Sequence, residues 1–292
     1  MSAARFAPGR GTVALLILAL AMDVRAAEVP RVAALVPYVT DALLRLDGQV
    51  AVVATVRTTL HEPPRPPCLD LGQAHAPNIE TLVESRPTVI VGDAILHAAR
   101  RDDLARTGAE VLLVRSDTVA RTFEDLVRVG RTVGAGERMA ALVAEARREV
   151  ETMATSAARS VLVLFGTPGA FFVVTDRTWV GDLLALLGYQ NLGARLLGDE
   201  RVPGFVLVSD EALVTLRPEI VLLISHGNAT AIQAAFAQRL APGGPLSALG
   251  AAARGGVHVL PAHLFSSNPG LALPAAARHL RQLLGPAAPA AP

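Results

Sequence analysis

The chain has 292 residues, 51% of them hydrophobic, and its 27 basic side chains nearly balance its 26 acidic ones. This length suits two globular domains of about 100 to 150 residues each. The sequence contains no run of like-charged residues that could bind along a phosphate backbone. We therefore expect no nucleic-acid partner.

The first residues show the pattern of a secretory signal peptide. Arg5 and Arg10 precede an apolar run that is too short to span a bilayer, and small residues follow it. We predict a signal peptide over residues 1–26, cut after Ala26 or Ala27; a buried or anchoring helix is the alternative. Since no cysteine at the cut site accepts a lipid, we expect a soluble protein in the periplasm.

Seven short runs of β-branched and aliphatic residues follow turn residues and are separated by helical patterns. They are RVAALVP, QVAVVATV, TVIVGD and EVLLVRS in the first half, then SVLVLFG, EIVLLIS and GVHVLP in the second. Such alternation predicts parallel sheets covered by helices. The predicted fold class is α/β, with an N-terminal lobe over residues 28–133, a C-terminal lobe over residues 159–286 and a cleft between them.

The segment between the lobes predicts one long α-helix. From Gly136 onward it has no proline, no internal glycine and strong helix formers throughout. We expect a bridging helix over residues 134–158. About 20 helical residues span on the order of 30 Å, so the bridge should be stiff and large hinge closure is not expected. The tail, residues 287–292, is low in complexity and predicted to be disordered.

One stretch of the sequence occurs twice. Residues 80–91 read ETLVESRPTVIV, and from Glu211 the chain reads EALVTLRPEIVLL. In each copy the glutamate opens a short amphipathic helix, and Pro87 or Pro218, which lacks a backbone donor, ends it before a buried strand. We expect equivalent helix-to-strand units, one in each lobe.

The order and spacing of these segments resemble the substrate-binding proteins of ABC importers for iron chelates, heme and cobalamin, in which one long helix bridges two α/β lobes. The resemblance runs from RVAALVPYVTDALLRL through APNIETLVESRPTVIVGD, TWVGDLLALLGYQNL and SDEALVTLRPEIVLLISHG to LFSSNPG. It is greatest to heme receptors, whose C-terminal lobe carries a turn similar to ISHG. The resemblance implies a transport protein that binds a small-molecule iron chelate; we expect a monomer and no enzyme.

In that family an acidic residue on each lobe pairs with arginines of the permease. The matching positions here are Glu80 and Glu211. The repeat would then present one carboxylate per lobe to a roughly two-fold symmetric partner. Alternatively, each glutamate only opposes the dipole of its helix N-terminus, and the two roles are compatible.

Two histidines are the candidate metal ligands. Ligands of open α/β layers bind at the carboxyl ends of strands; His75 lies in a loop before the first repeat, and His226 follows the strand that the second repeat enters. Neutral imidazole is a common axial ligand of heme iron, and two ligands must approach from opposite faces. In the similar heme receptors the position of His226 is an axial His and that of His75 an axial Met, while others place a Tyr where Gln73 stands. We predict axial ligation by both; the alternative is ordinary loop hydrogen bonding.

Aromatic and basic residues complete the predicted heme site. Tyr38, Phe171, Phe172 and Trp179 are expected to wall the pocket, with core packing as the alternative for the phenylalanines. For the propionates we expect a cation, Arg177 or else Arg57. Of the other histidines, His61 and His263 lie in predicted cleft loops, His97 and His279 on predicted helix surfaces, and His258 on a strand.

Two other functions are open at this point. A receptor for cobalamin or a ferric siderophore would share the fold and need no axial histidine. A free-metal carrier or enzyme would use His61, His75 and His226, but HExxH, nucleophile-elbow, Walker and dinucleotide motifs are all missing from the sequence. Cys68 is the only cysteine, so no intramolecular disulfide forms.

Overall fold

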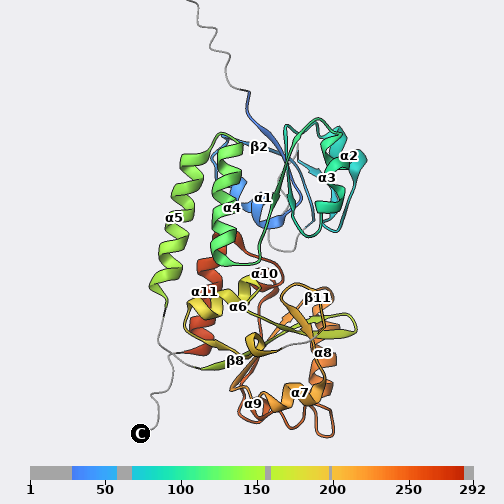
Figure 1. Cartoon of the computed structure of the whole chain (residues 1–292), viewed down its shortest axis with the longest axis vertical. Coiled ribbons are helices and arrows are strands. Elements are labelled where there is room, and N and C mark those ends of the chain that lie inside the picture. Colours follow the sequence, from blue (N-terminus) through green and yellow to red (C-terminus); the bar gives the residue numbers. More distant parts are fainter. Residues whose placement is uncertain (1–27, 58–67, 155–158, 197–198, 286–292) are drawn as a thin grey trace, which may run out of the picture.

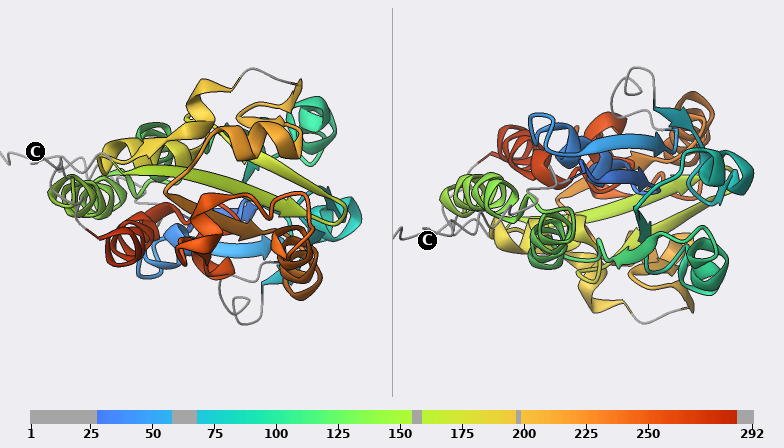
Figure 2. Two further views of the ribbon diagram at one scale, coloured as in Figure 1. Left: turned by 90° about the horizontal axis from the view of Figure 1, so that it is seen from below. Right: turned by 90° about the horizontal axis from the view of Figure 1, so that it is seen from above.

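The computed structural model describes residues 28–57, 68–154, 159–196 and 199–285. The predicted signal peptide, the predicted tail and His61 lie outside these residues. Two α/β lobes are stacked along the long axis and are joined along one side by helices (Figure 1). Helices lie on both faces of each sheet (Figure 2). The predicted fold class is confirmed.

The N-terminal lobe contains a five-stranded, all-parallel sheet in the order β3-β2-β1-β6-β7. Its strands are β1 (Arg31–Ala34), β2 (Ala51–Thr55), β3 (Leu69–Asp70), β6 (Val89–Asp93) and β7 (Glu110–Val114). A small hairpin and three helices complete the lobe: β4 (Gly72–Gln73), β5 (Ala76–Pro77), α1 (Pro37–Leu44), α2 (Ile79–Glu84) and α3 (Arg101–Ala105). All four apolar runs of the first half are strands, because β-branched side chains suit a sheet buried on both faces.

The C-terminal sheet is mixed, which the sequence did not predict. Its order is β11-β12-β9-β8-β13-β14, with β10 also on β8. Strands β8 (Ser160–Thr167), β10 (Gln190–Asn191), β13 (Ile220–Ser225) and β14 (Val257–Val259) are parallel, whereas β9 (Ala170–Val174), β11 (Asp199–Val202) and β12 (Phe205–Leu207) are antiparallel to their neighbours. The helices are α6 (Trp179–Leu186), α7 (Asp210–Thr215), α8 (Ala229–Leu240), α9 (Gly250–Ala253), α10 (Ala262–Phe265) and α11 (Leu273–Leu284).

The bridge between the lobes is a pair of packed helices. α4 (Val119–Thr132) packs against α5 (Gly136–Thr152), and both run along the side of the molecule (Figure 1). The predicted single helix over residues 134–158 is too long, because α5 ends at Thr152 with Met153 as its C-cap. Its 17 residues still span about 25 Å.

Close packing of α4 on α5 depends on Gly130. A Cβ atom added there would lie 2.4 Å from the Cβ of Met139, so a larger side chain must push the helices apart. Gly130→Ala should therefore lower the free energy of unfolding by about 1–3 kcal/mol, measured by urea denaturation. Glu124→Ala, an exposed change on the same helix, should alter it by less than about 0.5 kcal/mol. Equal values for the two variants would contradict this packing.

The two lobes share one core. Among the described residues, buried hydrophobic side chains form three clusters, and the largest joins both sheets to the bridging helices through Val91, Phe123, Met139 and Val163. Polar contacts add to this link. The Asn268 amide of the C-terminal lobe donates to the carbonyl of Ser116 (3.2 Å) and the hydroxyl of Thr122 (2.8 Å), and the Val119 N–H donates to Asp182 (2.8 Å). The shared core supports the expectation of lobes held at a fixed angle.

The two copies of the repeat have the same local structure. Asn78 and Ser209 cap α2 and α7 by accepting backbone N–H bonds. Each helix is followed by an arginine with left-handed backbone, then by the predicted proline and a buried strand. In the described part of the chain, no helix is long and apolar enough to cross a membrane.

Candidate ligand-binding cleft

A cavity of about 1640 Å³ lies between the lobes. Its walls are the segments that follow β1, β2, β6 and β7 in the N-terminal lobe and β9 and β13 in the C-terminal lobe, together with residues near α10. The loops after parallel strands meet here, as predicted from strand direction. The cavity exceeds the roughly 300–1,000 Å³ of most small-molecule sites, so it suits a large ligand.

His226 is held in one orientation at the C-terminal wall. It follows β13, is exposed in the cleft, and stacks on Phe165 with ring centroids 5.2 Å apart. Its Nδ1 lies 3.2 Å from the carbonyl oxygen of Ser266. Because a carbonyl only accepts, Nδ1 carries a proton, and in the neutral imidazole Nε2 then keeps its lone pair. This is the tautomer of a metal-ligating histidine with an outer partner.

His75 lies on the opposite wall, at the two-residue turn of the β4–β5 hairpin, and is exposed in the same cavity. The hairpin is tied to the sheet by a second histidine. The Asp93 N–H donates to Nδ1 of His97 (2.8 Å), so Nε2 of His97 carries the proton and donates to the carbonyl of Ala74 (2.8 Å). The residue next to His75 is therefore fixed to the end of β6.

The prediction that His97 lies on a helix surface is wrong. Its exposed fraction is 1%, and it packs against Gly92, where an added Cβ would lie 3.3 Å from the imidazole Nδ1. Of the other histidines, His258 lies on β14 as predicted and His279 on α11, partly buried against Phe265. His263, on α10, is not among the described residues that line the cleft.

The aromatic wall differs from the predicted one. Trp179 lines the cleft and stacks on Phe265, and Tyr38 lines it from the first turn of α1. Phe171 instead packs on Phe236 and lines a separate hollow beside α8, while Phe172 is not among the described residues lining either cavity. The predicted loop is the β8–β9 hairpin, whose strand directs these two side chains to opposite faces of the sheet.

Three phenylalanines replace the predicted pair. Phe165, Phe205 and Phe265 line the cleft, and the first two pack edge-to-face with centroids 5.0 Å apart. They come from β8, β12 and α10, far apart in the sequence. No local enrichment marks them, so only the tertiary fold brings them together.

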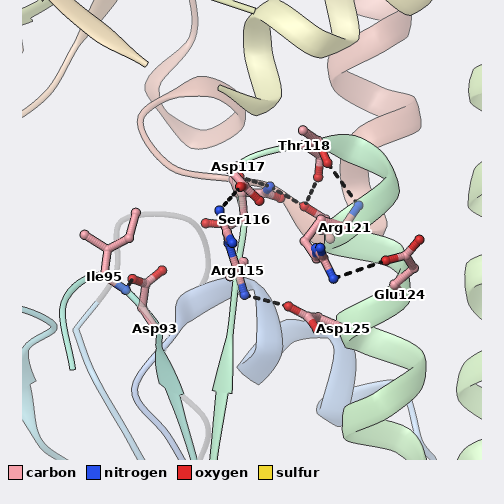
Figure 3. Close-up of polar contacts among 11 residues, drawn as sticks. Asp93, Ile95, Arg115, Ser116, Asp117, Thr118, Arg121, Glu124 and Asp125 are labelled. Atoms are coloured by element: carbon pink, nitrogen blue, oxygen red, sulfur yellow. Dashed lines mark hydrogen bonds and ion pairs between the residues drawn. The ribbon is translucent and has the colours of Figure 1, made fainter. Parts of the chain in front are cut away.

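Arginines of the cleft are paired with carboxylates. Arg57 lies 2.7 Å from Asp70, and this contact lowers the pKa of Asp70. Arg115 lies 2.6 Å from Asp117, beside the start of α4 (Figure 3). Arg177, the first predicted propionate ligand, also lines the cleft. A ligand carboxylate that binds Arg57 or Arg115 would have to share the guanidinium with the aspartate or displace the aspartate from it.

Buried polar groups lie at the cleft floor. The hydroxyls of Tyr38 and Ser225, one from each lobe, have no hydrogen-bond partner in the described part of the chain. Burial, with the nearby carboxylates of Asp125 and Asp93, raises the pKa of Tyr38 well above its ordinary value, so it stays protonated. Burial also raises the pKa of Cys68 to about 11. Cys68 is thus a thiol at neutral pH and a poor metal ligand.

The two repeat glutamates are exposed in separate lobes. Glu80 lies in the first turn of α2 and Glu211 in the first turn of α7. Hydrogen bonds from its own backbone N–H and from Ser209 lower the pKa of Glu211, so it is ionised at neutral pH. Among the described residues, no three His, Cys, Asp or Glu side chains are grouped to hold a metal ion.

The chain belongs to the periplasmic binding protein family, whose model matches residues 32–263. The predicted family resemblance is therefore confirmed. A curated relative, the high-affinity heme uptake system protein IsdE of Staphylococcus aureus, is 20% identical over 172 residues, which are 57% of this chain and 57% of the relative. The match thus spans little more than half the length of that relative.

Solved structures show the same fold. S. aureus IsdE complexed with heme has a TM-score of 0.75 at 19% identity, covering 88% of this chain and 99% of that chain. The periplasmic vitamin B12 binding protein BtuF of Vibrio cholerae has a TM-score of 0.68 at 16% identity, covering 87% and 96%. These proteins carry different ligands on one architecture, so the ligand of this chain must be argued from its own cleft.

Proposed function

We propose that this protein captures heme in the cleft and delivers it, in the periplasm, to the permease of an ABC importer. One observation carries the proposal: His75 and His226 come from opposite lobes and line the same cavity. Axial ligation needs imidazoles on opposite faces of the porphyrin. The tautomer of His226 and the heme ligand of a structural neighbour support the same ligand.

Apolar walls would supply most of the attraction for heme. Removing a few hundred Å² of porphyrin from water stabilises the complex by at most about 10 kcal/mol at about 25 cal/mol per Å². Association costs of several kcal/mol oppose this. The iron ligands would add affinity and discriminate against metal-free porphyrin.

An absorbance titration tests the ligand. Hemin should produce a saturable, shifted Soret band with low-spin, six-coordinate features, and metal-free protoporphyrin should bind more weakly. Cyanocobalamin and a ferric siderophore are the comparison ligands. Saturation by either of these, with no specific hemin complex, would refute the heme proposal.

A receptor for cobalamin is the second candidate. Heme brings two carboxylates, yet Arg57 and Arg115 already pair with Asp70 and Asp117 in the cleft. A ligand with neutral amide side chains would leave these pairs intact. It would also tolerate His75→Ala and His226→Ala, which the heme proposal does not.

For docking, we propose that Glu80 and Glu211 contact the permease, one from each lobe. Glu80→Ala combined with Glu211→Ala should impair heme delivery to the importer while hemin affinity is unchanged, because neither side chain is among the described residues lining the cleft. Glu84→Ala, exposed on the same helix as Glu80, is the control and should deliver normally. Weaker hemin binding by the double variant would argue against a docking role.

A further inference from the structure

The two repeats share an unusual backbone feature. Arg86 and Arg217 follow α2 and α7, and their φ angles are 46° and 47°. In the described part of the chain, Asp47 (φ 50°) is the only other residue besides glycine with positive φ. The left-handed region brings the Cβ of a non-glycine residue close to a carbonyl oxygen, so glycine is the residue that fits it without strain.

The fold accounts for the backbone of these arginines and not for their side chains. The Arg86 carbonyl accepts a hydrogen bond from Nε of Arg31 (3.0 Å), a contact that any residue would provide. Both side chains are exposed, and neither forms a hydrogen bond or ion pair with another described residue. Neither arginine is among the described residues that line the cleft. Strained residues of this kind cluster at functional sites.

We propose that Arg86 and Arg217 are docking residues that pair with carboxylates on the two permease subunits; this rests on the proposed delivery to an importer. Each arginine lies two residues after the end of the helix whose first turn holds Glu80 or Glu211, so each lobe offers one cation and one anion in the same order. A partner with two-fold symmetry meets the same pair twice. Charges of both signs at fixed spacing set register and disfavour wrong partners.

Glycine substitution separates the effect of these two positions on stability from their effect on docking. Arg86→Gly with Arg217→Gly should keep or slightly raise the melting temperature, because glycine relieves the backbone strain. The same variant should bind the permease–ATPase complex of its own organism, reconstituted in nanodiscs, about 5- to 25-fold more weakly. The loss should shrink at high salt. Hemin affinity should be unchanged.

Two matched variants control for strain and for charge. Asp47→Gly relieves the same left-handed backbone elsewhere on the surface, where Asp47 pairs with Arg138 at 3.2 Å, and should dock normally. Arg86→Lys with Arg217→Lys keeps both charges and should retain most of the binding.

The outcomes distinguish docking through these arginines from lipid contact and from the separate proposal of heme capture. Normal docking by the double glycine variant overturns it, and so does an equal loss of binding to anionic nanodiscs without permease, which would mean lipid contact. If hemin fails to bind but docking still depends on the arginines, the docking proposal holds and the proposal that heme is the ligand is wrong. If hemin binds and neither the arginine nor the glutamate variants lose docking, heme capture holds and this surface is not the docking face.

Discussion

His226→Ala is expected to convert the hemin complex from a six-coordinate, low-spin to a five-coordinate spectrum and to weaken hemin binding more than His75→Ala does. His226 is already oriented by the Ser266 carbonyl and by stacking on Phe165, so it loses little conformational freedom on ligation. His75 sits at an exposed hairpin turn. Loss of even outer partners of metal ligands costs about 10- to 100-fold, so removing His226 itself should cost at least that.

The measurement is a hemin titration of both single variants followed by Soret and visible absorbance. His258→Ala, on β14 and not among the described residues lining the cleft, is the control and should match the wild type. If both His75→Ala and His226→Ala kept the wild-type spectrum, the ligand assignment would be wrong.

His97→Ala should have the second large effect, on stability and on hemin binding together. The substitution removes a buried ring and leaves the Asp93 N–H and the Ala74 carbonyl without their partner. We expect the free energy of unfolding to fall by about 2–4 kcal/mol, measured in urea. Because the hairpin that carries His75 loses its tie to β6, hemin affinity should also fall.

A double-mutant cycle tests whether His97 acts through His75. In the His75→Ala background, His97→Ala should lower hemin affinity no further, since the ligand that it positions is already gone. Full additivity of the two losses would mean that His97 only supports the fold. His258→Ala, on β14 and not among the described residues that line the cleft, should leave hemin affinity unchanged.

Strands and the repeat were predictable because each has a strong local signal. β-branched runs such as those of β6 and β13 are buried in the sheets, and the Arg-Pro step marks the end of α2 and α7 in both copies. The placement of His226 at the cleft also follows from strand direction, because it comes directly after the parallel strand β13. His75 reaches the same cleft from the turn of the β4–β5 hairpin, which follows β3. What the sequence predicted well was therefore local pattern plus one topological rule.

The aromatic wall and His97 could not be predicted because tertiary contacts decide them. The sequence places Phe171 in a cleft loop, but the turn at Gly169 reverses the chain into β9, and the Phe171 side chain packs on Phe236 of α8. His97 has no periodic neighbours, and its burial depends on Gly92 and on a hairpin more than twenty residues earlier. Helix propensity alone marks no stop before residue 159, whereas α5 ends at Thr152.

Electron paramagnetic resonance of the ferric hemin complex tests the central claim most directly, because it reports the axial ligands of the iron. The wild-type protein should give the low-spin signal of iron between two imidazoles, and His75→Ala and His226→Ala should each convert it to a high-spin signal. A high-spin signal from the wild-type complex, or a low-spin signal that survives both substitutions, would contradict heme capture by one histidine from each lobe.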